Sequence, residues 1–234
     1  VDAITDYKKG VVSLLGNVRH EGDFAWREGM RVSDVISEND QLNPDTDLNV
    51  ALVVREFANS VDIRVLSFNP GNVLSGANTN DNLELMSRDL IVVLSAYGDR
   101  VAELAPYVAK LKRQIKLGRL PKVVTAEGTV RFPGEYPLVD GRSGGDLIEV
   151  AGGLMDSAYS QSAEIARIDM SNPSRAVNAI VLSSLNSGSV TRLEPSDYVE
   201  FRTVPGFRET QTISLEGEFV FPGVYAFDKG ETLT

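Results

Sequence analysis

Short runs of apolar residues, bounded by glycine, proline or charged residues, recur along the chain. Val50–Val54 and Ile91–Leu94 are among the longest of them, and they have the length of a strand, far short of the roughly 20 residues that cross a bilayer. The segment Val123–Val130 is rich in β-branched residues, and 164–168 and 179–182 follow it as further apolar runs. These patterns predict β-strands and no membrane-spanning segment.

One stretch has the different spacing of a helix. Its apolar residues recur every three or four positions and comprise Val101, Leu104, Ala105, Val108, Leu111 and Ile115. Basic residues lie between them in the second half of the stretch, where they suit the negative end of a helix dipole. The pattern predicts an amphipathic helix. Because proline is best tolerated in the first turn, Pro106 predicts a regular helix that starts near Ala105.

The chain repeats itself. Residues 11–55 align without a gap with residues 123–167, at the constant offset 123 − 11 = 112, and twelve of the 45 aligned positions are identical. The identical pairs include Gly16 with Gly128, Arg19 with Arg131, Gly22 with Gly134, Asp34 with Asp146, and Arg55 with Arg167. Each copy therefore predicts the same supersecondary unit.

The last 23 residues form a third copy, at the offset 212 − 123 = 89, in which Phe221-Pro222-Gly223 repeats Phe132-Pro133-Gly134. This copy ends at Thr234, after about the first half of the unit. A hairpin without its helix and return strands cannot cover its own apolar face. We expect it to pack on the second copy, to pair with another molecule or to be poorly ordered.

Each full unit has the pattern of a small sheet that holds one helix. Pro133-Gly134 predicts a type II turn inside a hairpin, because proline presets φ and glycine accepts a positive φ. The capping-box spacing of Ser143–Asp146 starts a short helix, and Gly152-Gly153 ends it. Two strands and a closing phrase follow, Leu193–Phe201, which matches Leu85–Val93. The order strand, hairpin, helix, strand, strand predicts an α+β fold of the β-grasp (ubiquitin-like) kind.

The repeats and the helix together predict the domain organisation. We expect a leading segment over 1–10, a first β-grasp domain over 11–97, a linker helix over 98–119, a second β-grasp domain over 120–208, and a partial third over 209–234.

Composition excludes several classes of function. Lys and Arg total 23, whereas Asp and Glu total 33, so the net charge is −10 and nucleic-acid binding through phosphate neutralisation is disfavoured. The absence of cysteine and the single histidine, His20, exclude thiolate nucleophiles, disulfides, Fe–S clusters and zinc sites that need two such ligands. We predict no metal and no cofactor.

Motifs that could carry chemistry are weak. Asp45, Asp47, Asn49 and Glu56 have the spacing of positions 1, 3, 5 and 12 of a calcium loop, but Val50 stands where that loop requires glycine. His20 could serve as a base for a serine nucleophile, Ser13 or Ser33, yet copies two and three carry phenylalanine in its place. We therefore predict no catalytic residue and a protein that is not an enzyme.

Four residues are candidates for contact with a glycan or a neighbouring subunit. Arg19 and Arg131 share one position of the repeated hairpin, and Trp26 and Tyr159 could stack on sugars. The plainer alternatives stay open, namely that the arginines are ordinary exposed charges and that the aromatic residues anchor a core or a subunit interface.

The phrase Glu127–Leu138, followed by Asp146-Leu147-Ile148 and Ala151–Leu154, resembles the soluble-ligand-binding β-grasp domain. Tandem copies separated by a helix resemble the periplasmic part of bacterial outer-membrane polysaccharide export proteins, the translocons of capsule and exopolysaccharide. Copy one departs from the pattern, with His20-Glu21-Gly22 in place of Phe-Pro-Gly. The family's lipid-attachment cysteine, N-terminal export domain and C-terminal membrane helix are not in these residues, so the resemblance implies a middle part of such a protein.

The resemblance implies a periplasmic, outer-membrane-associated scaffold that forms a homo-oligomeric ring and guides a polysaccharide outward without catalysis. Its implied partners are the polysaccharide and an inner-membrane polysaccharide co-polymerase. The alternative is a β-grasp receptor domain for a small ligand, a sugar or a cofactor. A ring needs complementary faces on every copy, whereas a receptor needs one concave pocket.

Overall fold

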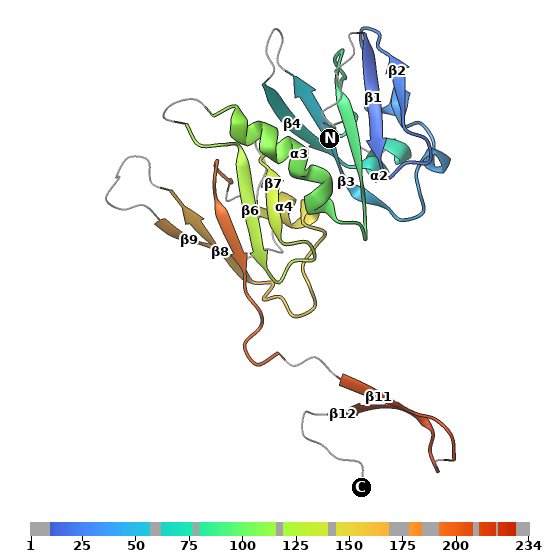
Figure 1. Ribbon diagram of the computed structural model, residues 1–234, viewed down its shortest axis with the longest axis vertical. Helices are drawn as coiled ribbons and strands as arrows, with labels where there is room; N and C mark the ends of the chain where they lie inside the picture. The colour runs from blue at the N-terminus through green and yellow to red at the C-terminus, as the bar shows by residue number, and fades with distance from the viewer. Residues whose placement is uncertain are drawn as a thin grey trace.

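The computed structural model is a mixed α+β protein with three separate sheets (Figure 1). The α+β class predicted from the sequence is confirmed. The structure describes residues 10–56, 62–76, 80–115, 119–139, 144–168, 178–183, 192–207, 211–218 and 220–227. None of the helices in these ranges has the length and apolar content that crossing a bilayer requires.

The first five-stranded sheet, with its helices, is called the first unit and covers residues 11–95. Its strands are β1 (Val11–Gly16), β2 (Gly22–Ala25), β3 (Thr46–Glu56), β4 (Ile63–Phe68) and β5 (Leu90–Ser95). Its helical segments are α1 (Val32–Val35), η1 (Asn39–Gln41) and α2 (Pro70–Ser75). The strand order is β2-β1-β5-β3-β4, and β1 and β5 run parallel at the centre.

The second five-stranded sheet, called the second unit, covers residues 123–201. Its elements are β6 (Val123–Gly128), β7 (Gly134–Pro137), α4 (Gly144–Val150), β8 (Ser162–Arg167), β9 (Asn178–Ser183) and β10 (Tyr198–Phe201). The order β7-β6-β10-β8-β9 repeats that of the first sheet strand for strand, with β6 and β10 parallel at the centre. The helix α3 (Arg100–Arg113) joins the two units.

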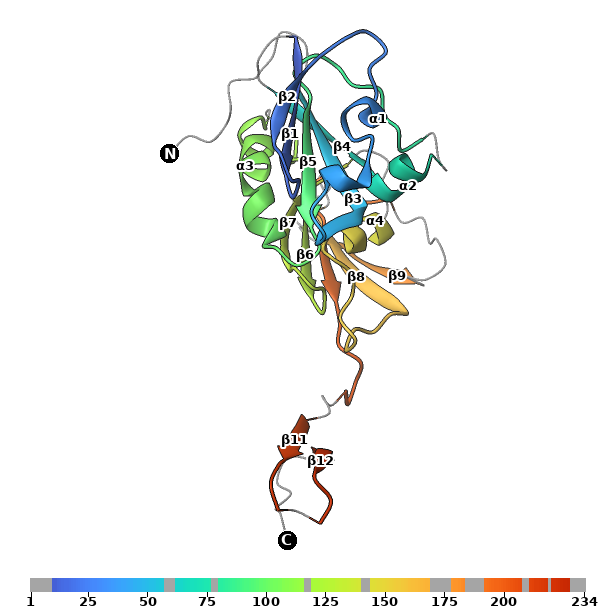
Figure 2. The same cartoon turned by 90° about the vertical axis from the view of Figure 1, so that its right-hand side faces the viewer.

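The third copy is a two-stranded hairpin of β11 (Gln211–Leu215) and β12 (Gly223–Phe227). In two perpendicular views it lies away from both units (Figures 1 and 2). Of the three outcomes expected from the sequence, packing on the second unit is therefore not the one that the structure shows.

Both full units turn out of their first strand through a glycine with positive φ. Gly16 has φ 96° and Gly128 has φ 87°. A Cβ at either position would collide with a carbonyl oxygen of the adjacent central strand, Val93 O of β5 or Phe201 O of β10. Glycine is required here because two backbones touch and because L side chains rarely adopt this φ.

An arginine–aspartate pair with a fully buried carboxylate closes each unit at the start of its last strand. Arg55 Nε donates to Asp89 Oδ1 at 2.8 Å, and Arg167 Nε donates to Asp197 Oδ1 at 2.9 Å. Each arginine also donates to a main-chain carbonyl, Glu84 O or Arg192 O, at 2.7 and 3.0 Å. The hydrogen bond with Asp197 is the main cause that raises the pKa of Arg167.

Two sequence predictions about local geometry are wrong, namely the type II turn at Pro133-Gly134 and the start of the helix α3. A type II turn requires φ near +80° at its glycine, but Gly134 has φ 155° and Gly22 and Gly223 have no positive φ. Gly134 instead begins β7 where α3 passes closely, since a Cβ there would lie 2.6 Å from Val101 Cγ2. The hairpin residue with a left-handed φ near that value is Gly128, at 87°.

The helix α3 starts at Arg100, not near Ala105, and Pro106 lies inside it. Asp99 caps the helix by accepting a hydrogen bond from Ala102 N at 3.0 Å, which satisfies one of the free N–H groups of the first turn. Burial of Leu104, Val108 and Leu111 stabilises the helix further. The cap and the buried face outweigh the hydrogen bond that proline removes.

The prediction for the shorter helix is confirmed at its C-terminal end. Gly152 and Gly153 have φ values of 83° and 96°, and Gly153 N donates to Ile148 O at 2.8 Å. Left-handed glycines therefore end α4, as the pattern indicated. The predicted N-cap, Ser143, lies outside the described residues.

The first sheet is covered on both faces. One face packs on α1 and α2, and the other packs on the buried side of α3 (Figure 2). The residues beneath α3 are apolar and include Leu15, Leu52, Val54, Leu90 and Val92. This face forms one continuous hydrophobic core with α3 and the interior of the second unit.

The matching face of the second sheet is polar. At the repeat-equivalent positions it carries Glu127, Glu164, Ala166, Tyr198 and Glu200. Glu200 pairs directly with Glu127 on one neighbouring strand and with Glu164 on the other. Arg202 forms an ion pair with Glu164 at 2.8 Å, but Glu200 still faces a carboxylate on each side. Like charges on neighbouring strands repel one another, which favours leaving this face in water.

Replacing the central carboxylate should therefore stabilise the protein. We expect Glu200→Thr to raise the free energy of unfolding by about 0.2–1 kcal/mol, with a larger gain at low salt. Chemical denaturation at two ionic strengths measures this. The control is Glu28→Thr, at an exposed position outside the sheets, for which no gain is expected. A loss of stability in Glu200→Thr would contradict the repulsion.

Candidate functional site at the junction of the two units

The two candidate arginines occupy the loops that follow β1 and β6. Arg19 N donates to Gln41 O at 2.9 Å, and Arg131 N donates to Gly153 O at 3.0 Å. Both side chains are exposed, and Arg19 Nε also reaches Leu42 O at 3.2 Å. The shared position therefore closes the same loop in each unit through its backbone.

The two candidate aromatic residues have internal partners. Trp26 packs on the first core and its Nε1 donates to Leu85 O at 2.8 Å. Tyr159 is partly buried and its hydroxyl donates to Gln161 Oε1 at 3.0 Å. Trp26 lies at the opposite end of the β1–β2 hairpin from Arg19. No hydrogen bond or ion pair links any two of the four described candidates, so the structure does not gather them into one site.

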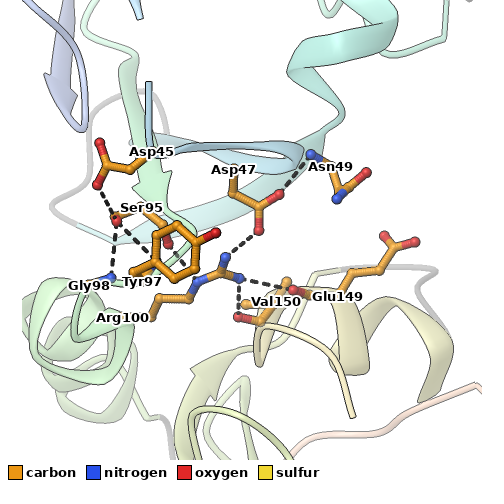
Figure 3. A network of polar contacts seen from close by, with 9 residues as sticks. All are labelled: Asp45, Asp47, Asn49, Ser95, Tyr97, Gly98, Arg100, Glu149 and Val150. Carbon is orange, nitrogen blue, oxygen red and sulfur yellow. Dashed lines mark hydrogen bonds and ion pairs between the residues drawn. The ribbon is translucent and has the colours of Figure 1, made fainter. Parts of the chain in front are cut away.

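The structure instead concentrates polar contacts where the two units meet (Figure 3). At the centre is Arg100, the first residue of α3, which is only 1% exposed. Its NH2 group is paired with Asp47 of β3, and its Nε donates to Ser95 O at the end of β5 at 3.0 Å. The guanidinium thus ties together the two strands that flank the junction in the first unit.

The same guanidinium reaches into the second unit. Its NH1 group donates to Glu149 O at 3.0 Å and to Val150 O at 3.1 Å, both at the C-terminal end of α4. These carbonyls are among the last four of a helix, which have no partner within it. The guanidinium carbon also lies 5.2 Å from the ring centroid of Phe132, close enough for a cation–π contact. Arg100 therefore caps a helix of one unit from the core of the other.

Ser95 organises the turn that leads into α3. Its hydroxyl donates to Asp45 Oδ2 at 2.8 Å and accepts from Tyr97 N and Gly98 N at 3.1 and 3.0 Å. The hydrogen bond from Ser95 is the main reason that the pKa of Asp45 lies below its usual value. The turn is thereby held in the shape that delivers Arg100 to the junction.

A polar cleft of about 210 Å³ lies beside this network, between α2 and the ends of β3 and β4 on one side and α4 on the other. Its polar lining includes Asn49, Asn69, Asn72, Asp81, Asp146 and Glu149. Asp81 accepts from Asn69 N and Asn72 Nδ2 at 2.9 and 2.8 Å. Amide and carboxylate groups of this kind can bond the hydroxyl groups of a hydrated ligand.

The apolar pocket next to the cleft is much smaller. It measures about 20 Å³ and lies among Val124, Tyr136, Leu147 and Leu193, which is room for about one water molecule. Small-molecule sites are usually several hundred Å³ and mainly apolar. The geometry does not favour a compact apolar ligand.

The described residues offer little support for a metal site or for a serine nucleophile activated by His20. No group of three or more His, Asp or Glu side chains there could hold a metal ion. His20 is exposed, while the Ser13 hydroxyl donates to Asp23 at 2.6 Å and the Ser33 hydroxyl accepts from Asn82 at 2.9 Å. Neither hydroxyl is therefore hydrogen-bonded to the histidine.

Little in the sequence points to the junction. Asp47 is replaced by Tyr159 in the second copy, and Arg100 lies outside the aligned segments. Because the repeat could not mark these two residues, their pairing emerges only from the packing of the units. No protein-family model matches the chain, and no curated protein matches it.

Removing the guanidinium should loosen the junction strongly. We expect Arg100→Met to lower the free energy of unfolding by about 3–5 kcal/mol, because it leaves Asp47 buried without a counter-charge. The double variant Arg100→Met/Asp47→Leu should recover part of this loss, and urea denaturation measures both.

The matched control is Lys112→Met on the same helix. Lys112 and Glu135 form an ion pair with side chains 43% and 45% exposed, so its loss should change the free energy of unfolding by less than about 1 kcal/mol. Equal effects of Arg100→Met and Lys112→Met would show that the buried network does not hold the units together.

Proposed function

We propose that this chain is a non-catalytic scaffold segment of a bacterial polysaccharide export protein, built from tandem β-grasp units. The observation that carries the proposal is the repetition of one architecture. Two sheets share the same strand order with a central parallel pair, and the same glycine and arginine–aspartate positions recur in both. The export function itself comes from the resemblance of the Glu127–Leu138 phrase to the family.

The junction supports the scaffold role. A protein that lines a path for a long polymer must keep its repeated units at a fixed angle, and Arg100 joins them through contacts to both. The polar face with Glu127, Glu164 and Glu200 suits a hydrated glycan that must pass without being held. In this proposal the protein is periplasmic, outer-membrane-associated and ring-forming, with an inner-membrane polysaccharide co-polymerase as its partner.

A second candidate is a receptor for a small polar ligand such as a sugar. The cleft of about 210 Å³ between the units favours it, because its lining offers hydrogen-bond groups from both sides. The two candidates differ in stoichiometry, since a receptor needs one occupied cleft per chain and a scaffold needs an assembly.

Light scattering of the natural polypeptide that contains this chain, in detergent and over a range of concentrations, tests the proposal. The scaffold predicts a closed assembly of fixed mass that persists on dilution. A second experiment, an NMR titration of residues 10–227 with neutral and acidic oligosaccharides, tests the receptor alternative. A monomer at every concentration, together with saturable shifts at Asn49, Asn72 and Glu149, would replace the scaffold with the receptor.

A further inference from the structure

The polar cleft at the junction has two chemically different walls. The first unit contributes the side-chain amides of Asn49, Asn69 and Asn72, and the second unit contributes the carboxylates of Asp146 and Glu149. Asn49 extends from β3 and Glu149 from α4, both on the same side of Arg100 (Figure 3). A ligand in the cleft would therefore meet amide groups of one unit and negative charge of the other.

Two amides of the first wall have donors that the protein does not use. Within the described residues the side chain of Asn49 has no hydrogen-bond partner. Asn69 accepts from Asn72 N through Oδ1 at 2.7 Å, while its Nδ2 group donates to none of the described residues. An amide NH₂ group offers two donors. These donors suit the oxygen atoms of hydroxyl groups on a ligand.

The first wall is held in place before any ligand binds. Asp81 accepts from Asn69 N and Asn72 Nδ2 at 2.9 and 2.8 Å, so it fixes both amides. Asn49 N donates to Asp47 Oδ1 at 2.8 Å, within the stretch where the register of β3 against β5 shifts. A wall that is already ordered lowers the entropy cost of binding.

The charge of the cleft has one sign. Asp81, Asp146 and Glu149 line it, and none of the described lining residues is basic. Arg100, in the adjoining network, is paired with Asp47 and 1% exposed, so it does not offset this charge. A cleft lined by one sign of charge concentrates ligands of the opposite sign. The cleft thus favours a cationic ligand and repels an acidic sugar.

The size of the cleft limits the ligand to a small one. Its volume of about 210 Å³ lies below the roughly 300–1,000 Å³ of sites for drug-sized molecules. The lining is also mainly polar, which disfavours an apolar compound. These limits fit one hydroxyl-rich ring better than a length of polymer.

We propose that the cleft binds a single amino sugar. Its hydroxyl groups accept hydrogen bonds from Asn49 and Asn69, and its ammonium group donates to the carboxylate of Glu149. Hydrogen bonds between charged groups are the stronger kind, so the ammonium group sets the specificity. This site adds a binding activity to the proposed scaffold and gives the receptor alternative a specific ligand; assembly of a ring does not depend on it.

An NMR titration of the ¹⁵N-labelled chain with glucosamine tests the proposal, in mildly acidic buffer where the amine is protonated. The neutral probe with the same ring is N-acetylglucosamine. We expect saturable shifts at Asn49, Asn72 and Glu149, with about tenfold higher affinity for glucosamine. A tenfold ratio corresponds to one hydrogen bond to a charged group.

Three variants separate the two walls. Glu149→Gln keeps the shape of the side chain and removes its charge, so it should lower the affinity for glucosamine about tenfold and leave that for N-acetylglucosamine unchanged. Asn49→Ala should weaken both sugars, because they share the hydroxyl groups. The matched control is Glu200→Gln, on the polar face of the second sheet, which should leave both affinities unchanged.

The proposal is overturned by equal affinity for the two sugars, by glucosamine binding that Glu149→Gln does not weaken, or by shifts confined to residues outside the cleft. Binding of neither sugar also overturns it. In that case a closed assembly in light scattering would show that the scaffold role still holds, so the two proposals can fail separately.

Discussion

The arrangement of the two units depends on one buried cation. Arg100 is 1% exposed and bonds to Asp47, Ser95 O, Glu149 O and Val150 O. A buried guanidinium is tolerated only where its charge is paired and its N–H groups are bonded. Because these partners come from β3, β5 and α4, satisfying one side chain fixes the position of a strand pair against a helix of the other unit. The same residue starts α3, so the helix that covers the first sheet is placed by the same network.

The two units share one arrangement of strands but differ in the residues on one face of the sheet. Their strand order, left-handed glycines and arginine–aspartate pairs coincide. They diverge on the face that α3 covers in the first unit, where Leu52 and Val92 correspond to Glu164 and Glu200 of the second. The repeated parts are those that a single unit needs to fold. The differing parts are those that decide whether its outer face meets a helix or water.

The sequence predicted what the repeat or a local pattern could encode. The strands, the end of α4 at Gly152-Gly153 and the α+β class follow from apolar runs and glycine positions. The start of α3 was missed because Pro106 was given more weight than the cap at Asp99. The Pro133-Gly134 turn was misplaced because the glycine is explained by a contact with Val101, which lies on a distant segment and leaves no local signal. The Asp47–Arg100 pair is of the same kind, since no spacing or repeat links its members.

A fixed angle between the two units is the central claim, and it follows from the buried network at Arg100. Backbone residual dipolar couplings in solution test it most directly. Couplings from β1, β3 and β5 and those from β6, β8 and β10 should fit one common alignment tensor. Two tensors of clearly different magnitude or orientation would show that the units move independently and would contradict the claim.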